Sequence, residues 1–202
     1  MGEPVQAIET FYDGYRFRSR LEARWAVFFH EAGIQYEYEP EGFNLPNCGY
    51  YLPDFYLPMF GAYVEVKPLS ISHEDEETAK EKLIELFYGI DGITILLKGD
   101  PVDMNIQLYA NDANDSNGGE GWWTSKENCV RFMFIDYGSF GCPCIYYYNI
   151  HDHILYNSDW SIRENVYNGY MTPNDFYPMT KEALKARQAR FEHGEYPGVV
   201  NQ

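Results

Sequence analysis

The chain has 202 residues, of which 45% are hydrophobic and 23% charged, and its formal net charge is −16 at pH 7. The hydrophobic content excludes disorder throughout, and the length is sufficient for one core with or without a small appendage. No stretch approaches the twenty or so apolar residues of a membrane span, and residues 1–4 do not begin a signal peptide. The sequence therefore predicts a cytoplasmic globular protein whose cysteines are reduced.

The first predicted helix runs to about Ala32, with Ser19 as its N-cap and Gly33 after its end. Apolar residues recur three and four positions apart along it and form one buried stripe. Glu22 lies at the edge of this stripe, where a glutamate with no role beyond the surface is not expected. We expect its carboxylate to point across the sheet toward two acidic residues later in the sequence, Asp54 and Glu65.

Four arginines crowd the start of this helix and are candidates for contacts with nucleic-acid phosphates. They are Arg16, Arg18, Arg20 and Arg24. The net charge opposes such binding, which normally relies on lysine and arginine, but the local distribution of charge matters more than the sum. The alternative is that these arginines merely balance neighbouring acids. Weak intrinsic DNA affinity, or recruitment by a partner protein, is the expected consequence.

Three segments then read as strands. Residues 35–39 alternate as an early strand, and residues 49–57 predict a second strand, which delivers Asp54 directly after Pro53. In the third segment, residues 62–67, the side-chain period of two places Glu65 and Lys67 on one face. The valines of that segment fall on the opposite face, where they can enter a core.

Two carboxylates and a lysine that converge from neighbouring strands can hold a divalent metal ion and activate a water molecule beside it. Asp54, Glu65 and Lys67 are therefore a candidate phosphodiester-cleaving site, with Glu22 as a third carboxylate. Taken singly, each feature has an ordinary alternative. Pro-Asp is common turn chemistry, Glu-x-Lys is a common solvated strand pattern, and Glu22 could simply pair with a nearby arginine.

Together, these motifs resemble the PD-(D/E)xK nuclease superfamily. The matching segments are residues 18–26 (RSRLEARWA), 36–40 (YEYEP), 51–55 (YLPDF) and 63–68 (YVEVKP). Their spacing is most similar to phage-encoded members and to the transposon end-cleaving endonucleases of that superfamily. The resemblance covers roughly residues 15–100, about half of the chain.

The resemblance implies a restriction-endonuclease-like core of helix, mixed sheet, helix and strand, and a Mg²⁺-dependent DNA endonuclease activity. It assigns Asp54 and Glu65 as ligands of one or two Mg²⁺ ions, with Mn²⁺ as a substitute. Glu22 would join them directly or through water, and the backbone carbonyl of Val66 would be a further oxygen ligand. Lys67 would orient or help deprotonate the attacking water and stabilise charge on the phosphate.

The rest of the first half fits an α/β layer. Four acidic residues at 74–77 suit the first turn of a helix that ends at Gly89, and residues 92–97 read as a buried strand. The acidic residues could be mistaken for a second metal cluster, but a solvated first turn explains them better.

The second half is rich in aromatic residues between 122 and 170, after a loop or boundary at 111–121. Residues 130–137 and 144–150 predict strands joined by a turn at 138–141. The aromatic side chains are expected in a core, with stacking on unpaired bases as the alternative. The sequence thus predicts a nuclease-like core at 1–101 and a β-rich extension at 102–202. The extension is either separate or packed with the core as one domain.

Cysteines and histidines in this half raise the question of a zinc site. They are Cys129, Cys142, Cys144, His151 and His153. Cys-x-Cys and His-x-His are poor matches to the two-to-four-residue gaps of structural zinc sites. Buried thiols and surface histidines are the favoured interpretation, and Zn²⁺ is not expected.

A final helix is predicted from an N-cap at Thr180 through Phe191 to Gly194. Its cations make it the compact basic helix of the chain: Lys181, Lys185, Arg187 and Arg190. It could lie along DNA or a partner, or its cations could serve only the end of the helix.

The leading hypothesis is a metal-dependent deoxyribonuclease of a phage or prophage, acting on DNA in the bacterial cytoplasm, as a homodimer or with a recruiting protein. The second is a catalytically silent binding protein on the same fold, an acidic inhibitor or DNA mimic. The third is a zinc-stabilised structural module. The presence of Lys67 beside two carboxylates favours the first, because a mimic has no need of it.

Overall fold

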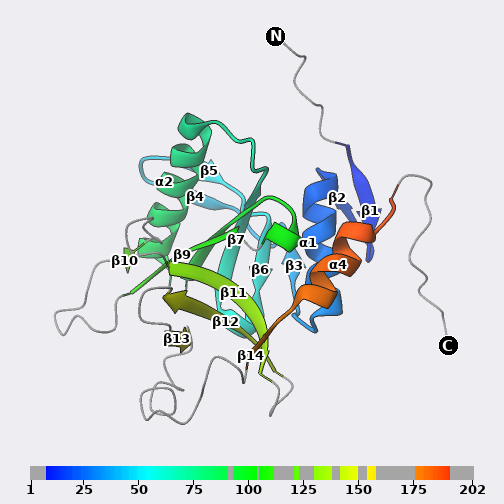
Figure 1. The fold of residues 1–202 in the computed structure, drawn as a ribbon. Coiled ribbons are helices and arrows are strands. Elements are labelled where there is room, and N and C mark those ends of the chain that lie inside the picture. The colour runs from blue at the N-terminus through cyan, green and yellow to red at the C-terminus, as the bar shows by residue number, and fades with distance from the viewer. Residues whose placement is uncertain are drawn as a thin grey trace.

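The computed structural model describes residues 8–90, 93–103, 105–111, 121–122, 130–137, 142–149, 154–157 and 176–191. They form a mixed α/β fold around a six-stranded sheet, with helices on both of its faces (Figure 1). From edge to edge, the strands are β10 (Gly121–Trp122), β9 (Asn105–Asn111), β8 (Ile93–Lys98), β7 (Ala62–Lys67), β6 (Phe55–Leu57) and β3 (Glu37–Tyr38).

Strand directions in this sheet are mixed. β6 is antiparallel to β7, β7 is parallel to β8, and β8 is antiparallel to β9. The short 3-10 helix η1 (Pro58–Phe60) and Gly61, at φ 58°, connect β6 to β7. The parallel pair requires a crossover, which the helix α2 (His73–Gly89) supplies. The prediction of an α/β layer with a mixed sheet is confirmed.

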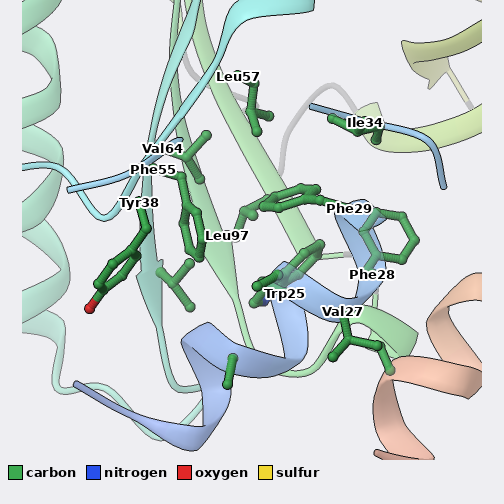
Figure 2. Packing of buried hydrophobic residues seen from close by; sticks show 14 of the residues in the cluster. Trp25, Val27, Phe28, Phe29, Ile34, Tyr38, Phe55, Leu57, Val64 and Leu97 are labelled. Carbon is green, nitrogen blue, oxygen red and sulfur yellow. The ribbon is translucent and has the colours of Figure 1, made fainter. Parts of the chain in front are cut away.

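The helix α1 (Arg20–Glu31) covers one face of the sheet. The Ser19 hydroxyl accepts a hydrogen bond from the Glu22 N–H at 3.1 Å, and Gly33 follows the helix at φ 68°, so both predicted ends are confirmed. Trp25 and Phe29 are fully buried, and Figure 2 shows them beside Phe55 and other apolar residues of the sheet. The Trp25 indole N–H also donates to the Gly99 carbonyl at 2.9 Å, which fixes α1 against the end of β8.

Side-chain alternation along β7 divides the core into two clusters. Val64 and Val66 pack with α1, whereas Tyr63 belongs to a cluster formed by residues of α2 and by Leu96 of β8. Glu65 and Lys67 lie two and four residues after Tyr63, so they are on the same face of β7, as their spacing predicts. This is the face that α2 covers.

Two predicted strands are shorter than expected. Residues 49–57 do not form one strand: β5 (Gly49–Tyr51) pairs with β4 (Phe43–Leu45), and β6 pairs with β7 in the central sheet. Pro53 separates the two because proline has no N–H to donate to a ladder. The early strand contracts to β3 because Glu39 adopts a left-handed φ of 47° and Pro40 follows it.

A second sheet has the strand order β13 (Ile154–Asn157), β12 (Cys142–Asn149), β11 (Val130–Tyr137) and β14 (Phe176–Pro178). The predicted strands at 130–137 and 144–150 thus exist and pair antiparallel, and the second begins two residues earlier than expected. The turn predicted at 138–141, and residues 112–120 of the predicted loop, lie outside the described residues. A hairpin of β1 (Thr10–Tyr12) and β2 (Tyr15–Phe17) was not predicted.

The last described helix, α4 (Thr180–Gln188), lies along α1 (Figure 1). Its N-cap is Met179, which makes no side-chain cap bond, so the prediction of Thr180 as the cap is wrong. The helix also ends at Gln188, before Phe191. Buried Ala183 and Ala186 face the α1-side core, which requires small residues at so close a contact. In the portion of the chain that is described, no helix is long and apolar enough to span a membrane.

Candidate functional site

Asp54 occupies the junction between the β4–β5 hairpin and β6. Only 3% of the residue is exposed, and each of its two carboxylate oxygens has a partner. Oδ2 accepts a hydrogen bond from the Val66 N–H at 2.7 Å, and Oδ1 lies 2.5 Å from Nη2 of Arg18. The bond to Val66 holds Asp54 against β7, the neighbouring strand that carries the other two predicted site residues.

Glu65 and Lys67 are two residues apart on β7 and form an ion pair. Lys67 Nζ lies 2.5 Å from Glu65 Oε1, and the other oxygen, Oε2, accepts a hydrogen bond from the Tyr51 hydroxyl at 2.8 Å. Glu65 is 8% exposed, whereas the Lys67 side chain is 31% exposed. The lysine therefore reaches from solvent toward a buried carboxylate.

Glu22 approaches the site from the first turn of α1. Its Oε1 accepts from the Ser19 hydroxyl at 2.6 Å, and its Oε2 accepts from the Tyr38 hydroxyl at 2.7 Å and from the Arg18 N–H at 3.1 Å. This acid is buried, at 7% exposure. The expectation that Glu22 is more than a surface acid is confirmed.

The three carboxylates share one electrostatic environment. Burial raises the pKa of Asp54 well above its usual value, and the charges of Glu65 and Glu22 raise it further. Lys67 and the Val66 N–H oppose this shift but do not cancel it. In geometric terms, Asp54 is bonded to β7, which carries the Glu65–Lys67 pair, and Arg18 contacts Asp54 with its side chain and Glu22 with its N–H.

Lys67 supplies positive charge to this cluster. Burial alone would lower its pKa, but the charges of Glu65 and Asp54 outweigh burial and raise the pKa above its usual value. Lys67 is accordingly an ammonium at neutral pH, which suits charge stabilisation better than proton abstraction.

The four predicted phosphate-binding arginines do not act as one group. Arg18 lies in the site, bridging Asp54 and Glu39, with its Nε 2.8 Å from Glu39 Oε1. Arg16 pairs with Glu9, which precedes β1, and Arg24 pairs with Asp100 after β8 at 3.1 Å. Arg20 is half-buried at the first position of α1. Of the four, Arg18 is the one whose described contacts include a site carboxylate.

The donor set is chemically suited to Mg²⁺, which prefers hard oxygen ligands. Asp54, Glu65 and Glu22 are buried carboxylates, and their crowding is relieved by any added positive charge. Among the described residues, no three or more His, Cys, Asp and Glu side chains are grouped as a ready metal cage. Arg18 and Lys67 each engage one of the carboxylate oxygens instead.

A second charged cluster flanks the site. Lys98 of β8 is the register partner of Lys67, and its Nζ lies 2.5 Å from Oε2 of Glu76 on α2. Glu76 also contacts Lys80 at 3.1 Å and Gln107 at 3.3 Å. Burial would raise the pKa of Glu76, but hydrogen bonds from Lys98 and Lys80 lower it to about 2. Glu76 is therefore not part of a purely solvated first turn, contrary to expectation.

We expect Glu76→Gln to lower the free energy of unfolding at pH 7 by about 1–3 kcal/mol, because it uncouples Lys98 from α2. The lowered pKa means that this stabilisation is complete above about pH 4.5 and is lost as the pH falls toward 2. Urea unfolding across this range measures it.

Glu77→Gln is the matched control, since the Glu77 side chain is 50% exposed in its pair with Lys80. Its effect should stay within about 0.5 kcal/mol. A pH-independent difference between Glu76→Gln and the unmodified protein would contradict the role of the ionised Glu76.

Two tyrosines at the site were missed in the sequence. Tyr38 and Tyr51 are 8% and 5% exposed, and each donates its hydroxyl to one site glutamate. Burial raises the pKa of Tyr51 well above its usual value, and the charge of Glu65 adds to the shift, so the hydroxyl stays protonated. Both lie inside the matching segments YEYEP and YLPDF, where a tyrosine on a strand reads as ordinary core.

The zinc candidates of the second half remain untested. Cys129, His151 and His153 lie outside the described residues, and the side chains of Cys142 and Cys144 are not described.

No known family profile matches the chain. A search of curated proteins finds no match either.

Proposed function

We propose that this protein is a metal-dependent deoxyribonuclease of the PD-(D/E)xK type, acting on phage or mobile-element DNA in a bacterial cytoplasm. The observation that carries the proposal is that three buried carboxylates and a lysine are supplied by neighbouring elements: the helix α1, the residue before β6, and β7. Asp54 stands before β6 and is bonded to β7, Glu65 and Lys67 lie on β7, and Glu22 on α1 accepts from the N–H of Arg18, whose guanidinium contacts Asp54. Chance clustering of three acids at such low exposure is costly to stability and needs a functional reason.

The fold around the site supports the same proposal. A helix, an antiparallel strand pair, a crossover helix and a parallel strand follow one another as α1, β6–β7, α2 and β8. This order fits a restriction-endonuclease-like core. Because Asp54 precedes one strand and Glu65 lies on its partner, strand pairing and the bond from the Val66 N–H to Asp54 together fix their separation.

Each residue of the site has a distinct role in the proposed reaction. Asp54 and Glu65 would hold Mg²⁺ together with the Val66 carbonyl, and Glu22 would bind it directly or through water. Bound Mg²⁺ would lower the pKa of a water ligand and polarise the phosphate. Lys67, already an ammonium, would orient the attacking water and stabilise the charge that develops on the phosphate.

Arg18 would take part once DNA is bound. Its guanidinium already lies on Asp54, and 55% of its side chain is exposed, so it can turn toward a phosphate without unfolding α1. Arginine suits this role because its planar donors match phosphate oxygens in pairs. A single arginine leaves the net charge of −16 largely unopposed, which favours a dimer or a recruiting protein as the source of DNA affinity.

Incubation of plasmid and branched DNA with the purified protein tests the proposal. We expect cleavage in Mg²⁺ or Mn²⁺ and none in EDTA, because the carboxylates have no other cation with which to activate water. Glu65→Gln should abolish cleavage. Glu37→Gln, an exposed acid on β3, should not change it. Equal cutting by both variants would mean a contaminant or a wrongly assigned site.

The net charge favours a second candidate, an acidic protein that occupies the basic groove of a partner. A binding protein of this kind would need the overall charge and not the arrangement of Lys67 between Glu65 and Asp54. Absence of cutting on every substrate, with all residues of the site intact, would favour it.

A further inference from the structure

Each of the three site carboxylates has at least one oxygen bonded to a donor of the rigid scaffold. For Asp54 this donor is the Val66 N–H at 2.7 Å, which belongs to the sheet. For the two glutamates it is a tyrosine hydroxyl, from Tyr38 to Glu22 at 2.7 Å and from Tyr51 to Glu65 at 2.8 Å.

The second oxygen of Asp54 and of Glu65 faces a different kind of donor. Arg18 contacts Oδ1 of Asp54, and Lys67 contacts Oε1 of Glu65, both at 2.5 Å. These two cations extend on long side chains that are 55% and 31% exposed. In Asp54 and Glu65, one oxygen is therefore held by the fold, and the other faces a cation that can exchange for another positive charge. In Glu22 both oxygens are held by neighbouring donors, Oε1 by the Ser19 hydroxyl at 2.6 Å and Oε2 by Tyr38.

Tyr51 is held by parts of the chain other than β7. It lies on the β4–β5 hairpin and packs with Leu83 and Leu86 of α2. The turn of this hairpin is tied to α2, because Glu85 accepts hydrogen bonds from the Asn47 N–H at 2.7 Å, the Asn47 side chain at 2.9 Å and the Cys48 N–H at 2.9 Å. The hairpin thus fixes the Tyr51 hydroxyl relative to Glu65 independently of the strand on which Glu65 sits.

Tyr38 is fixed in the same manner on the other side of the sheet. It lies on β3 among the buried rings of Phe17 and Phe55, at centroid distances of 4.4 and 5.4 Å. Its hydroxyl accepts from the Arg18 N–H at 3.0 Å while it donates to Glu22. With both functions used, the hydroxyl has one orientation, and so does the carboxylate that it holds.

We propose that Tyr38 and Tyr51 are positioning residues that orient Glu22 and Glu65 for binding a divalent metal ion. This inference rests on the proposed function. Each tyrosine touches the glutamate and not the reacting atoms, so its effect passes through the carboxylate. Outer donors of this kind typically change metal affinity or activity by about 10–100-fold when they are removed.

Isothermal titration of the metal-free protein with MnCl₂ alone, beside Tyr51→Phe and Tyr38→Phe, tests this inference. Phenylalanine keeps the buried ring and removes only the donor. We expect each variant to bind Mn²⁺ about 10-fold more weakly than the unmodified protein. Tyr63→Phe is the matched control, because Tyr63 lies on β7 beside Glu65 and donates to the exposed Glu41 at 2.7 Å. Its Mn²⁺ affinity should be unchanged.

Urea unfolding of the same variants separates positioning from stability. A purely structural hydroxyl would lower the unfolding midpoint and leave the Mn²⁺ affinity of the folded protein intact, and that result would overturn the inference. The variant Asp54→Asn shows whether the positioning role alone is wrong or the proposed function as a whole is wrong. If Asp54→Asn loses Mn²⁺ binding and both tyrosine variants keep it, only the positioning role is wrong. If the unmodified protein does not bind Mn²⁺, or binds it no more tightly than Asp54→Asn does, both proposals are wrong.

Discussion

Asp54→Asn is expected to lower metal-dependent DNA cleavage by about 10³-fold or more, since it removes the charge of a central metal ligand. Asparagine keeps the size of the side chain and one oxygen that can accept from the Val66 N–H. The fold therefore survives the change, and the loss reports on charge. Single-turnover cleavage of a plasmid in Mg²⁺ measures it.

The same substitution is expected to raise stability in EDTA at pH 7. Burial and the neighbouring Glu65 and Glu22 raise the pKa of Asp54, so the folded state binds its proton more tightly than the unfolded state does. Stability from this group is then present at low pH and is lost as the pH rises from about 3.9 through the raised pKa of the folded state. A gain of about 1 kcal/mol would raise the melting temperature by about 2–4 °C.

Thermal melts of both proteins between pH 4 and pH 8 measure the contribution of Asp54 together with the carboxylates coupled to it. The stability advantage of Asp54→Asn should shrink toward acid pH. Mg²⁺ should stabilise the unmodified protein and not the variant. Asp103→Asn, an exposed aspartate of the 3-10 helix η2 (Pro101–Asp103), is the control. A variant that cleaves DNA normally, or that is less stable at every pH, would contradict the assignment of Asp54 as a metal ligand.

The local signals in the sequence located most of the site. Ser19 and Gly33 bracket α1, and an acid at the edge of its apolar stripe pointed to Glu22. The alternation of β7 assigned Glu65 and Lys67 to one face. These signals depend on neighbours within a few residues, so the sequence carries them directly. The β1–β2 hairpin was also open to prediction, because Asp13-Gly14, at φ 50° and 80°, is a strong two-residue turn signal.

Other features depend on contacts between distant segments. The split of residues 49–57 follows from the competing partners β4 and β7, which the alternation pattern does not name. The roles of Tyr38 and Tyr51 depend on a hydroxyl that meets a carboxylate 16 and 14 residues away. In sequence, a tyrosine on a strand carries the same signal whether its hydroxyl faces solvent or a buried acid.

The partners of charged residues likewise depend on contacts between distant segments. Four arginines within nine residues were candidates for phosphate contacts, yet Arg16, Arg18 and Arg24 pair with acids from three different segments of the chain. Conversely, Glu76 looked like one of four solvated acids, but the packing of α2 against β8 brings Lys98 to it. The partner decides the role of a charged residue, and the partner is set by topology.

Lys67→Met is expected to lower cleavage by about 10²–10⁴-fold, because it removes the group that stabilises developing charge at the phosphate. Methionine retains much of the apolar stem that packs along β7. Unlike Asp54→Asn, this variant should also be less stable at pH 7 in EDTA, by about 1–3 kcal/mol, since Glu65 and Asp54 lose their shared cation. Urea unfolding and single-turnover cleavage measure the two effects.

Divalent metal should offset the stability loss without restoring catalysis. Mn²⁺ supplies the positive charge that Glu65 and Asp54 lack in Lys67→Met, so the variant should gain more stability from Mn²⁺ than the unmodified protein does. Lys67→Arg should keep stability, because the charge remains, but should not regain full cleavage, because guanidinium and ammonium differ in shape.

Lys98→Met is the matched control for Lys67→Met. Lys98 is the register partner of Lys67 on the adjacent strand, and it forms an equally short pair with a partly buried glutamate, Glu76, that lies outside the proposed metal site. Both variants should therefore lose stability, and only Lys67→Met should lose cleavage. If Lys98→Met abolished cleavage to the same extent, loss of a buried ion pair would account for both results. Lys67 would then have no specific part in the reaction.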